Sequence, residues 1–251
     1  MIPDSLRRFF EENPRPGLAF SGGSDSTYLL YVCHILEVDV VPYFVRGSFQ
    51  TPEEEETVRT SCARYGFEPR ILNVNVFDSP GIVSNGPDRC YLCKRFVFSR
   101  IIEAAKRDGR AYVMDGTNAS DDPAGRPGMR ALEEMGITSP LRICGITKAD
   151  VRRLSKEAGI PGWDRPSDSC LATRTPTGTP ITEDGLRRTY EAEKSVREFG
   201  FRGFRVRTRG TGARLEIDPS QRSILEDYME EIEAVLLKYY DSVSYGERTL
   251  S

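Results

Sequence analysis

Strand-like and helical patterns alternate through the first 145 residues, and this alternation restricts the fold more than any other feature of the sequence. Short apolar segments typical of buried strands lie at residues 17–20, 38–45, 70–77, 111–116 and 141–145. Segments with helical patterns lie between them, at residues 25–36, 52–66 and 94–109. The alternation predicts an α/β fold with a doubly wound parallel sheet. Ligands of such sheets bind beyond the carboxyl ends of the strands.

The pattern changes at residues 159–182, which contain four prolines and no hydrophobic period. Beyond this segment we expect a helix over 183–199, strands at 204–210 and 213–218, an amphipathic helix over 219–238 and a last short strand. The sequence therefore predicts a large α/β domain at 1–165, a cysteine-bearing linker at 166–182 and a smaller α+β domain at 183–251.

The composition excludes several classes of protein. The content of 38% hydrophobic and 29% charged residues is typical of a globular protein, and there is no run of about 18 apolar residues or apolar leader. We therefore expect a cytoplasmic protein without a membrane partner. The formal charge of −3 argues against nucleic acid as the main partner. A single histidine, His34, excludes zinc sites with several imidazoles and triads with a histidine base.

The sequence "SGGSDS" lies where a predicted strand turns into a predicted helix. Glycines let the backbone approach a phosphate closely, and helix N–H groups and serine hydroxyls can donate to its oxygens. The pattern lacks the lysine of a Walker loop. A carboxylate beside phosphates is repulsive without a cation, so Asp25 predicts Mg²⁺ as a cofactor. The alternative is a tight turn with a helix cap. The candidate phosphate-binding residues are Ser21, Gly22, Gly23, Ser24, Asp25 and Ser26.

The six cysteines fall into two groups. Three lie in apolar periodic segments and are expected to be core residues, namely Cys33, Cys62 and Cys144. Cys90, Cys93 and Cys170 lie in or beside predicted loops near basic residues, which favour the reactive thiolate. This trio is compatible with a zinc site, a persulfide-carrying redox pair, or a [4Fe–4S] cluster with one open iron. Unliganded thiols are the remaining alternative.

Arginines alternate along the segment "FRVRTRG". Arg205, Arg207 and Arg209 would leave a strand by the same face, where they would bind an anion such as a substrate phosphate or lie in solvent on an edge strand.

The loop "SGGSDS" resembles the pyrophosphatase (PP) loop of ATP-dependent adenylating enzymes. "DGTNASD", at residues 115–121, is similar to their second signature, in which Gly116, Thr117 and Asn118 would help to hold the nucleotide. The resemblance implies that ATP binds with Mg²⁺, that a substrate oxygen attacks the α-phosphorus, and that pyrophosphate leaves.

The motifs "RCYLCK", "PSDSCLATR", "AEKSVREFGFRGFRVR" and "ARLEI" follow in the same order as in the LarE-type ATP-dependent sulfur transferases, and the resemblance covers nearly the whole chain. It implies adenylation of a carboxylate of a pyridinium dicarboxylate mononucleotide and its conversion to a thiocarboxylate, in the synthesis of a nickel-pincer nucleotide cofactor. It also implies a small-molecule sulfide donor and a homo-oligomer. Arg205 and Arg207 match arginines that the family uses for the substrate phosphate or a bound anion. Glu193 and Glu216 match acidic positions facing the same site, where they would bind a divalent ion or balance the arginines.

Members of this family are of two kinds. In one, a cysteine matching Cys170 gives up its own sulfur and becomes dehydroalanine; in the other, three cysteines hold a [4Fe–4S] cluster that delivers external sulfide. Cysteines are present here at all three positions, so we expect the cluster-bearing kind. The alternatives are the sacrificial mechanism, a tRNA thiolation enzyme of the same superfamily, and a non-catalytic nucleotide-binding or sulfur-carrier module.

Overall fold

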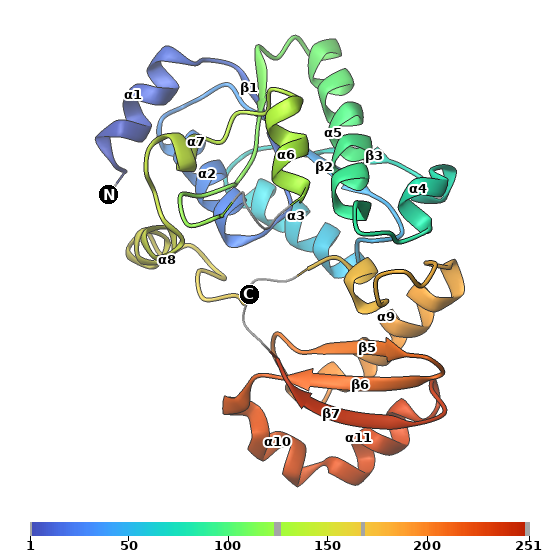
Figure 1. The fold of residues 1–251 in the computed structure, drawn as a ribbon. Coiled ribbons are helices and arrows are strands. Elements are labelled where there is room, and N and C mark those ends of the chain that lie inside the picture. The colour runs from blue at the N-terminus through green and yellow to red at the C-terminus, as the bar shows by residue number, and fades with distance from the viewer. Residues whose placement is uncertain (1, 123–126, 167–168, 249–251) are drawn as a thin grey trace. The chain divides into compact units, whose positions relative to one another are not determined.

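A computed structural model describes residues 2–122, 127–166 and 169–248 and divides into two compact units (Figure 1). The first unit comprises residues 1–47, 52–76 and 88–165, and the second comprises 48–51, 77–87 and 166–251. Residues 167 and 168, within the predicted linker, lie outside the described residues.

The first unit is built on a four-stranded parallel sheet. Its strands are β1 (Pro16–Ala19), β2 (Val41–Arg46), β3 (Arg70–Asn73) and β4 (Tyr112–Met114), in the order β3-β2-β1-β4. The chain runs outward from β1 to β3 and then returns to place β4 on the other side of β1. The predicted doubly wound parallel sheet is thus confirmed, and its switch point lies at the carboxyl ends of β1 and β4.

Helices cover both faces of this sheet. One face packs on α1 (Asp4–Glu12), α2 (Ser24–Ile35), α3 (Pro52–Arg64) and α8 (Lys148–Glu157). The other packs on α5 (Arg89–Arg107) and α6 (Pro127–Glu134). Along β2, Phe44 joins the first core whereas Tyr43 and Val45 join the second, which explains why this strand is apolar at successive positions. Cys33 and Cys62 are fully buried as predicted, whereas Cys144 is only half-buried.

One prediction for the first unit is wrong and another misses the start of a helix. Residues 141–145 were expected to form a strand, but Pro140–Ile143 form the short helix α7. Proline is favoured in the first turn of a helix, where its missing N–H removes no intrahelical bond. The helix predicted at 94–109 begins five residues earlier, at Arg89. Cys90 and Cys93 therefore lie in the first turns of α5 and not in a loop.

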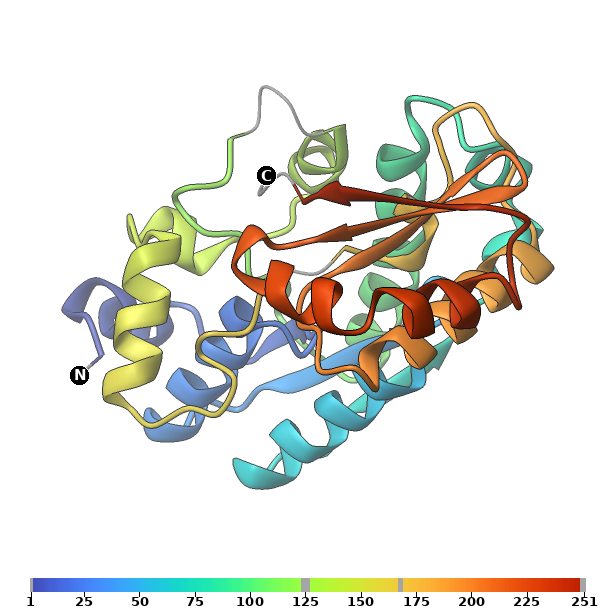
Figure 2. The ribbon, with the colours of Figure 1, turned by 90° about the horizontal axis from the view of Figure 1, so that it is seen from below.

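The second unit has a three-stranded sheet of β5 (Arg205–Arg209), β6 (Gly212–Ile217) and β7 (Val243–Glu247). Strands β5 and β6 are antiparallel, and β7 runs parallel to β6. The helices α9 (Glu183–Arg197), α10 (Arg222–Asp227) and α11 (Met229–Leu236) share one apolar core with this sheet (Figure 2). The second unit thus has the predicted α+β fold class.

The helix predicted over 219–238 is interrupted in the structure. Tyr228, with φ −125° and ψ 24°, leaves the helical conformation and separates α10 from α11. The short 3₁₀ helices Val76–Asp78, Leu171–Arg174 and Pro219–Gln221 and the helix α4 (Pro80–Val83) complete the elements of the described residues. Within those residues, every helix is too short or too polar to cross a membrane.

Candidate functional site

The predicted phosphate loop connects β1 to α2. Gly22 has φ +73°, in the left-handed region that favours glycine, and an ideal Cβ there would lie 3.2 Å from Thr57 Cγ2. The Ser26 hydroxyl donates to the Gly23 carbonyl over 3.1 Å and lies 3.2 Å from Ser21 Oγ, which closes the loop on itself. The N-cap residue of α2 is Gly23, which makes no side-chain cap hydrogen bond, so the backbone N–H groups of the first turn can donate to an anion.

The second signature meets this loop at the carboxyl end of β4. An ideal Cβ on Gly116 would lie only 3.0 Å from the backbone nitrogen of Ser26, so a side chain there would push the two loops apart by a few tenths of an ångström. Asp115 is 5% exposed and fixes the turn, because it accepts hydrogen bonds from Thr117 Oγ1 at 2.6 Å and from Ser139 Oγ at 2.7 Å. The structure thus brings two sequence-predicted segments, separated by about 90 residues, to one point.

Lys148, the first residue of α8, was missed by the sequence analysis. Its ammonium group donates to Asp25 Oδ2 at 2.6 Å and to Ser24 Oγ at 2.8 Å. A capping box between Thr147 and Asp150 fixes the start of α8 and hence the position of this lysine. The spacing of Thr147 and Asp150 in the sequence indicates the start of a helix. Neighbouring residues do not indicate which side chains Lys148 contacts. Lys148 supplies the positive charge that the loop itself lacks.

Only one of the two carboxylate oxygens of Asp25, Oδ2, accepts a hydrogen bond from Lys148. Its Oδ1 is buried and accepts no hydrogen bond within the described part of the chain. Burial raises the pKa of Asp25, and the contact with Lys148 opposes that rise. Mg²⁺ is usually held by one or two carboxylates together with substrate phosphates, so an unpartnered carboxylate oxygen beside a phosphate loop fits this ion. The described residues contain no group of three or more His, Cys, Asp or Glu side chains placed to hold a metal alone.

Cys90 and Cys93 lie one helical turn apart in α5. Residues at this spacing share a face of a helix, so both thiols are presented on the same side. Cys90 is exposed, Cys93 is half-buried, and Arg89 Nη2 lies 3.4 Å from Cys90 Sγ. Two accessible soft thiol donors beside a guanidinium fit an iron–sulfur ligand pair.

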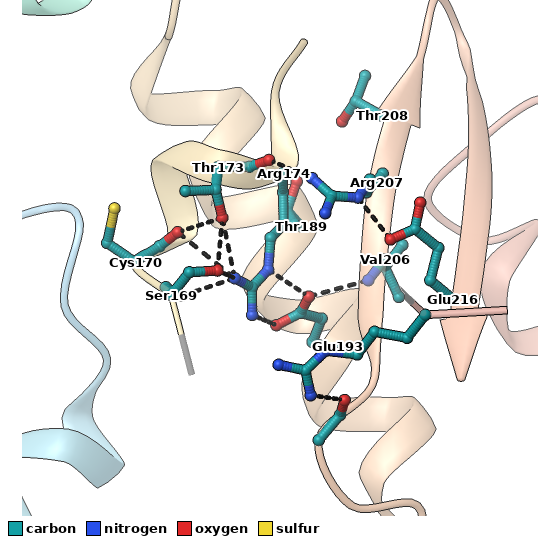
Figure 3. Close-up of polar contacts among 12 residues, drawn as sticks. Ser169, Cys170, Thr173, Arg174, Thr189, Glu193, Val206, Arg207, Thr208 and Glu216 are labelled. Atoms are coloured by element: carbon teal, nitrogen blue, oxygen red, sulfur yellow. Dashed lines mark hydrogen bonds and ion pairs between the residues drawn. The ribbon is translucent and has the colours of Figure 1, made fainter. Parts of the chain in front are cut away.

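Cys170 belongs to the second unit and precedes the 3₁₀ helix Leu171–Arg174 (Figure 3). Its loop is anchored by the buried side chain of Arg174, whose Nη1 donates to the Ser169 carbonyl at 2.6 Å and approaches the Cys170 carbonyl at 3.4 Å. In Figure 3 the sulfur of Cys170 points away from the guanidinium. The thiol of Cys170 is half-buried and, like the thiols of Cys90 and Cys93, forms no disulfide.

Arg174 is held in turn by Glu193. The guanidinium makes two parallel hydrogen bonds to the carboxylate, Nε to Oε1 at 2.8 Å and Nη2 to Oε2 at 3.1 Å, and both side chains are almost fully buried. Glu193 Oε1 also accepts the backbone N–H of Val206 at 2.9 Å, which ties α9 to β5. Of the predicted site residues, Glu193 is thus the one whose carboxylate joins the Cys170 loop to the sheet.

Arg207 reaches the same loop from the sheet. Its Nε donates to Glu216 Oε2 at 2.6 Å on the neighbouring strand, and its Nη1 donates to the Thr173 carbonyl at 2.8 Å (Figure 3). Arg205 is 8% exposed, Arg207 is half-buried and Arg209 is exposed, so the three arginines do not form a uniformly solvated edge. Arg205, Arg207 and Glu216 lie on the sheet face opposite the helices.

The site residues therefore form two sets. The first unit contains the phosphate loop, the second signature, Lys148, Cys90 and Cys93, and the second unit contains Cys170 with its network of arginines and glutamates. Convergence of the three cysteines on one cluster stays a prediction.

Comparison with known proteins identifies relatives along most of the chain, although no family model matches it. An uncharacterised protein of Synechocystis is 35% identical over 87% of this chain and 82% of its own. The pyridinium-3,5-bisthiocarboxylic acid mononucleotide synthase of Lactiplantibacillus plantarum is 33% identical over 81% of this chain and 74% of its own. The argininosuccinate synthase of Metallosphaera sedula is 25% identical over 57% of this chain and 40% of its own.

The parallel sheet, the loop between β1 and α2 and these relatives define an α/β protein of the PP-loop ATP pyrophosphatase superfamily. Within that superfamily, the chain belongs to the LarE-type sulfur transferases, which confirms the resemblance found in the sequence.

Proposed function

We propose that this protein is an ATP-dependent sulfur transferase that adenylates a carboxylate of pyridinium-3,5-biscarboxylic acid mononucleotide and converts it to a thiocarboxylate. The substrate class is supported by the name of the Lactiplantibacillus plantarum relative. Three groups that lie together support the ATP-dependent step. They are the first turn of α2 with its glycine N-cap, the loop that contains Gly116, and the ammonium group of Lys148.

In the first step a carboxylate oxygen of the substrate attacks the α-phosphorus of ATP. The bond between that phosphorus and the bridging oxygen breaks, and the electron pair leaves with pyrophosphate. The N–H groups at the start of α2 and the Lys148 ammonium offset the negative charge that develops on the leaving group. Asp25 and the phosphates would hold Mg²⁺, which when bound supplies further charge neutralisation.

In the second step a hydrosulfide sulfur forms a bond to the activated acyl carbon. The bond from that carbon to the AMP oxygen breaks, AMP leaves with the electron pair, and the sulfur proton goes to solvent. Cys90, Cys93 and Cys170 would hold a [4Fe–4S] cluster, which when bound supplies hydrosulfide at its open iron. The network around Arg174 holds the backbone of Cys170 in place for this role.

The substrate phosphate is assigned to Arg205 and Arg207. Support comes from the two guanidiniums on one face of β5, with Arg207 fixed by Glu216 and by the Thr173 carbonyl. Binding there would bring the mononucleotide close to the loop that carries Cys170. We include a cytoplasmic location and a homo-oligomeric state in the proposal; light scattering of the purified protein tests the latter.

The decisive assay measures pyrophosphate release with the dicarboxylate mononucleotide and ATP. We expect release by the wild-type protein and loss in Asp25→Ala with the fold retained by circular dichroism. Equal activity of Asp25→Ala would favour a non-catalytic nucleotide-binding or carrier module.

Iron and acid-labile sulfide in protein isolated without oxygen test the cluster. Loss of both in each of Cys90→Ala, Cys93→Ala and Cys170→Ala would support it. If only Cys170→Ala stops sulfur transfer, and Cys170 of the used protein has lost hydrogen sulfide by mass spectrometry, the sacrificial mechanism holds instead.

A further inference from the structure

A pocket lies beside the phosphate loop, within the first unit. Gly22, Ser24 and Thr27 form the wall that faces the loop. One face of α3 forms a second wall, with Thr57, Thr60, Ser61 and Arg64. The end of α8 and the segment after it close the third side, with Ser155, Ile160, Pro161, Gly162, Trp163 and Arg165. The cavity has a volume of about 220 Å³.

Hydroxyl groups line much of this pocket, and one of them lacks a partner. Ser155 is 1% exposed, and its Oγ makes no hydrogen bond within the described part of the chain. A buried hydroxyl without a partner is costly in a folded protein, so a ligand or water that supplies one would be stabilised there. The pocket wall thus contains an unused polar group of the kind that a polar ligand satisfies.

Two arginines supply positive charge to the lining of the pocket. Arg64 and Arg165 line the pocket, are exposed and form no ion pair within the described residues. The backbone N–H of Arg165 donates to the Gly162 carbonyl at 3.0 Å, and its Nε lies 3.6 Å from an ideal Cβ on Gly162, so the guanidinium folds back over the turn. Lys156 stacks on Trp163, with its ammonium 4.9 Å from the ring centroid.

The size and charge of the pocket restrict its ligand. Pockets for drug-sized molecules measure roughly 300 to 1,000 Å³, so this cavity suits a smaller molecule. Two guanidiniums, one carboxylate (Glu56) and several hydroxyls favour a compact anion. The pocket begins at the two phosphate-loop residues Gly22 and Ser24. A phosphate anion that leaves the loop would therefore meet this pocket directly.

We propose that this pocket binds inorganic pyrophosphate after it leaves the phosphate loop, with Arg64 and Arg165 as its cationic partners and Ser155 as a donor. The inference deepens the proposed function, because it rests on release of pyrophosphate from ATP. No bond forms or breaks in this step: the anion moves from the N–H groups of α2 to the guanidiniums and then to solvent. Arg64 and Arg165 are binding residues for the product.

The test uses inorganic pyrophosphate and the full-length protein without ATP. Trp163 is the only tryptophan of the chain and lines the pocket, so its fluorescence reports occupancy directly. We expect saturable quenching or a shift of emission on titration with pyrophosphate. Arg64→Ala and Arg165→Ala should each weaken binding about tenfold, the order expected for loss of one charge-assisted contact.

Two further variants sharpen the test. Arg59→Ala is the matched control, because Arg59 lies on α3 but pairs with Glu55 at 2.8 Å outside the pocket. It should bind pyrophosphate as the wild type does. Glu56→Gln removes the carboxylate from the lining and should tighten binding. All four substitutions are at exposed positions, where effects on folding are usually within about 0.5 kcal/mol.

The outcomes separate this inference from the proposed function. The pocket assignment is overturned if pyrophosphate binds without changing Trp163 emission. It is also overturned if Arg64→Ala and Arg165→Ala bind pyrophosphate as tightly as Arg59→Ala does. Either result would hold even if pyrophosphate is released from ATP. A Trp163 signal that is lost in Arg165→Ala but kept in Lys148→Ala supports the pocket, even if no carboxylate substrate releases pyrophosphate.

Discussion

The Arg174–Glu193 pair offers a direct test of how the Cys170 loop is held. Glu193→Gln keeps the shape of the side chain and a hydrogen-bond acceptor but removes the negative charge. The side chains of Arg174 and Glu193 are only 3% and 6% exposed. The substitution therefore removes the Glu193 charge from a guanidinium that stays buried.

The size of the effect follows from that burial. Removing one partner of a buried ion pair costs about 3 to 5 kcal/mol, because the remaining buried charge loses a counter-ion. Exposed pairs contribute only about 0 to 1 kcal/mol. For a chain of this size, 1 kcal/mol corresponds to a shift of about 2 to 4 °C in Tm. We expect Glu193→Gln to lower the unfolding temperature of the protein by roughly 6 to 20 °C.

Urea unfolding followed by far-ultraviolet circular dichroism measures the change in free energy. Glu247→Gln is the control, because its pair with Arg222 lies in the same unit with side chains 60% and 63% exposed. The double variant Arg174→Met/Glu193→Leu removes both charges and should recover much of the lost stability. If Glu193→Gln costs no more than Glu247→Gln, or the double variant is as unstable as the single one, the reasoning is refuted.

Three further predictions concern the first unit. Lys148→Ala should weaken ATP binding at least about tenfold, because a charge-assisted contact to phosphate is lost; calorimetric titration measures it. Gly116→Ala should weaken nucleotide binding, because its Cβ would lie 3.0 Å from the backbone nitrogen of Ser26 and displace the facing loop. Arg46 and Arg59 lower the pKa of Glu55 to about 2. The charged Glu55 should stabilise the fold fully at pH values above its ordinary pKa of 4.5, and this stabilisation should be lost as the pH falls through about 2. A carbon-13 titration of Glu55 measures its midpoint.

Matched variants decide these cases. Arg152→Ala, on the exposed side of α8, should bind ATP normally, and Gly86→Ala should be neutral because nothing lies within 4 Å of its Cβ. Arg46→Ala should return the Glu55 midpoint toward 4.5. Normal ATP affinity in Lys148→Ala or Gly116→Ala, or a Glu55 midpoint that Arg46→Ala leaves in place, would contradict the corresponding argument.

Local patterns were enough to predict the sheet and the phosphate loop. Strand and helix periods, glycines at a strand-to-helix turn and the "DGTN" turn are all encoded within a few neighbouring residues. The run at 141–145 was ambiguous because a short apolar segment fits a strand or a helix, and Pro140 before it was the signal for a helix. The interruption at Tyr228 follows no glycine or proline, so no local residue signals that the helix breaks there.

Long-range pairings could not be predicted in the same way. Lys148 meets Asp25 across 123 residues, and Arg174 meets Glu193 across 19 residues in another element. In the sequence, Arg174 is only one of several basic residues near the cysteines. Its role as the anchor of the loop depends on burial and on the direction of its side chain, which only the folded arrangement defines.

The contacts from Arg174 to the carbonyl oxygens of Ser169 and Cys170 have a consequence for chemical change at the Cys170 sulfur. The guanidinium approaches the carbonyl oxygen of Cys170, whereas the chemistry assigned to this residue concerns its sulfur. Oxidation, alkylation or loss of the sulfur would therefore leave the contact between Arg174 and the main chain unchanged. The main-chain position of this residue is therefore set independently of the chemical state of its side chain.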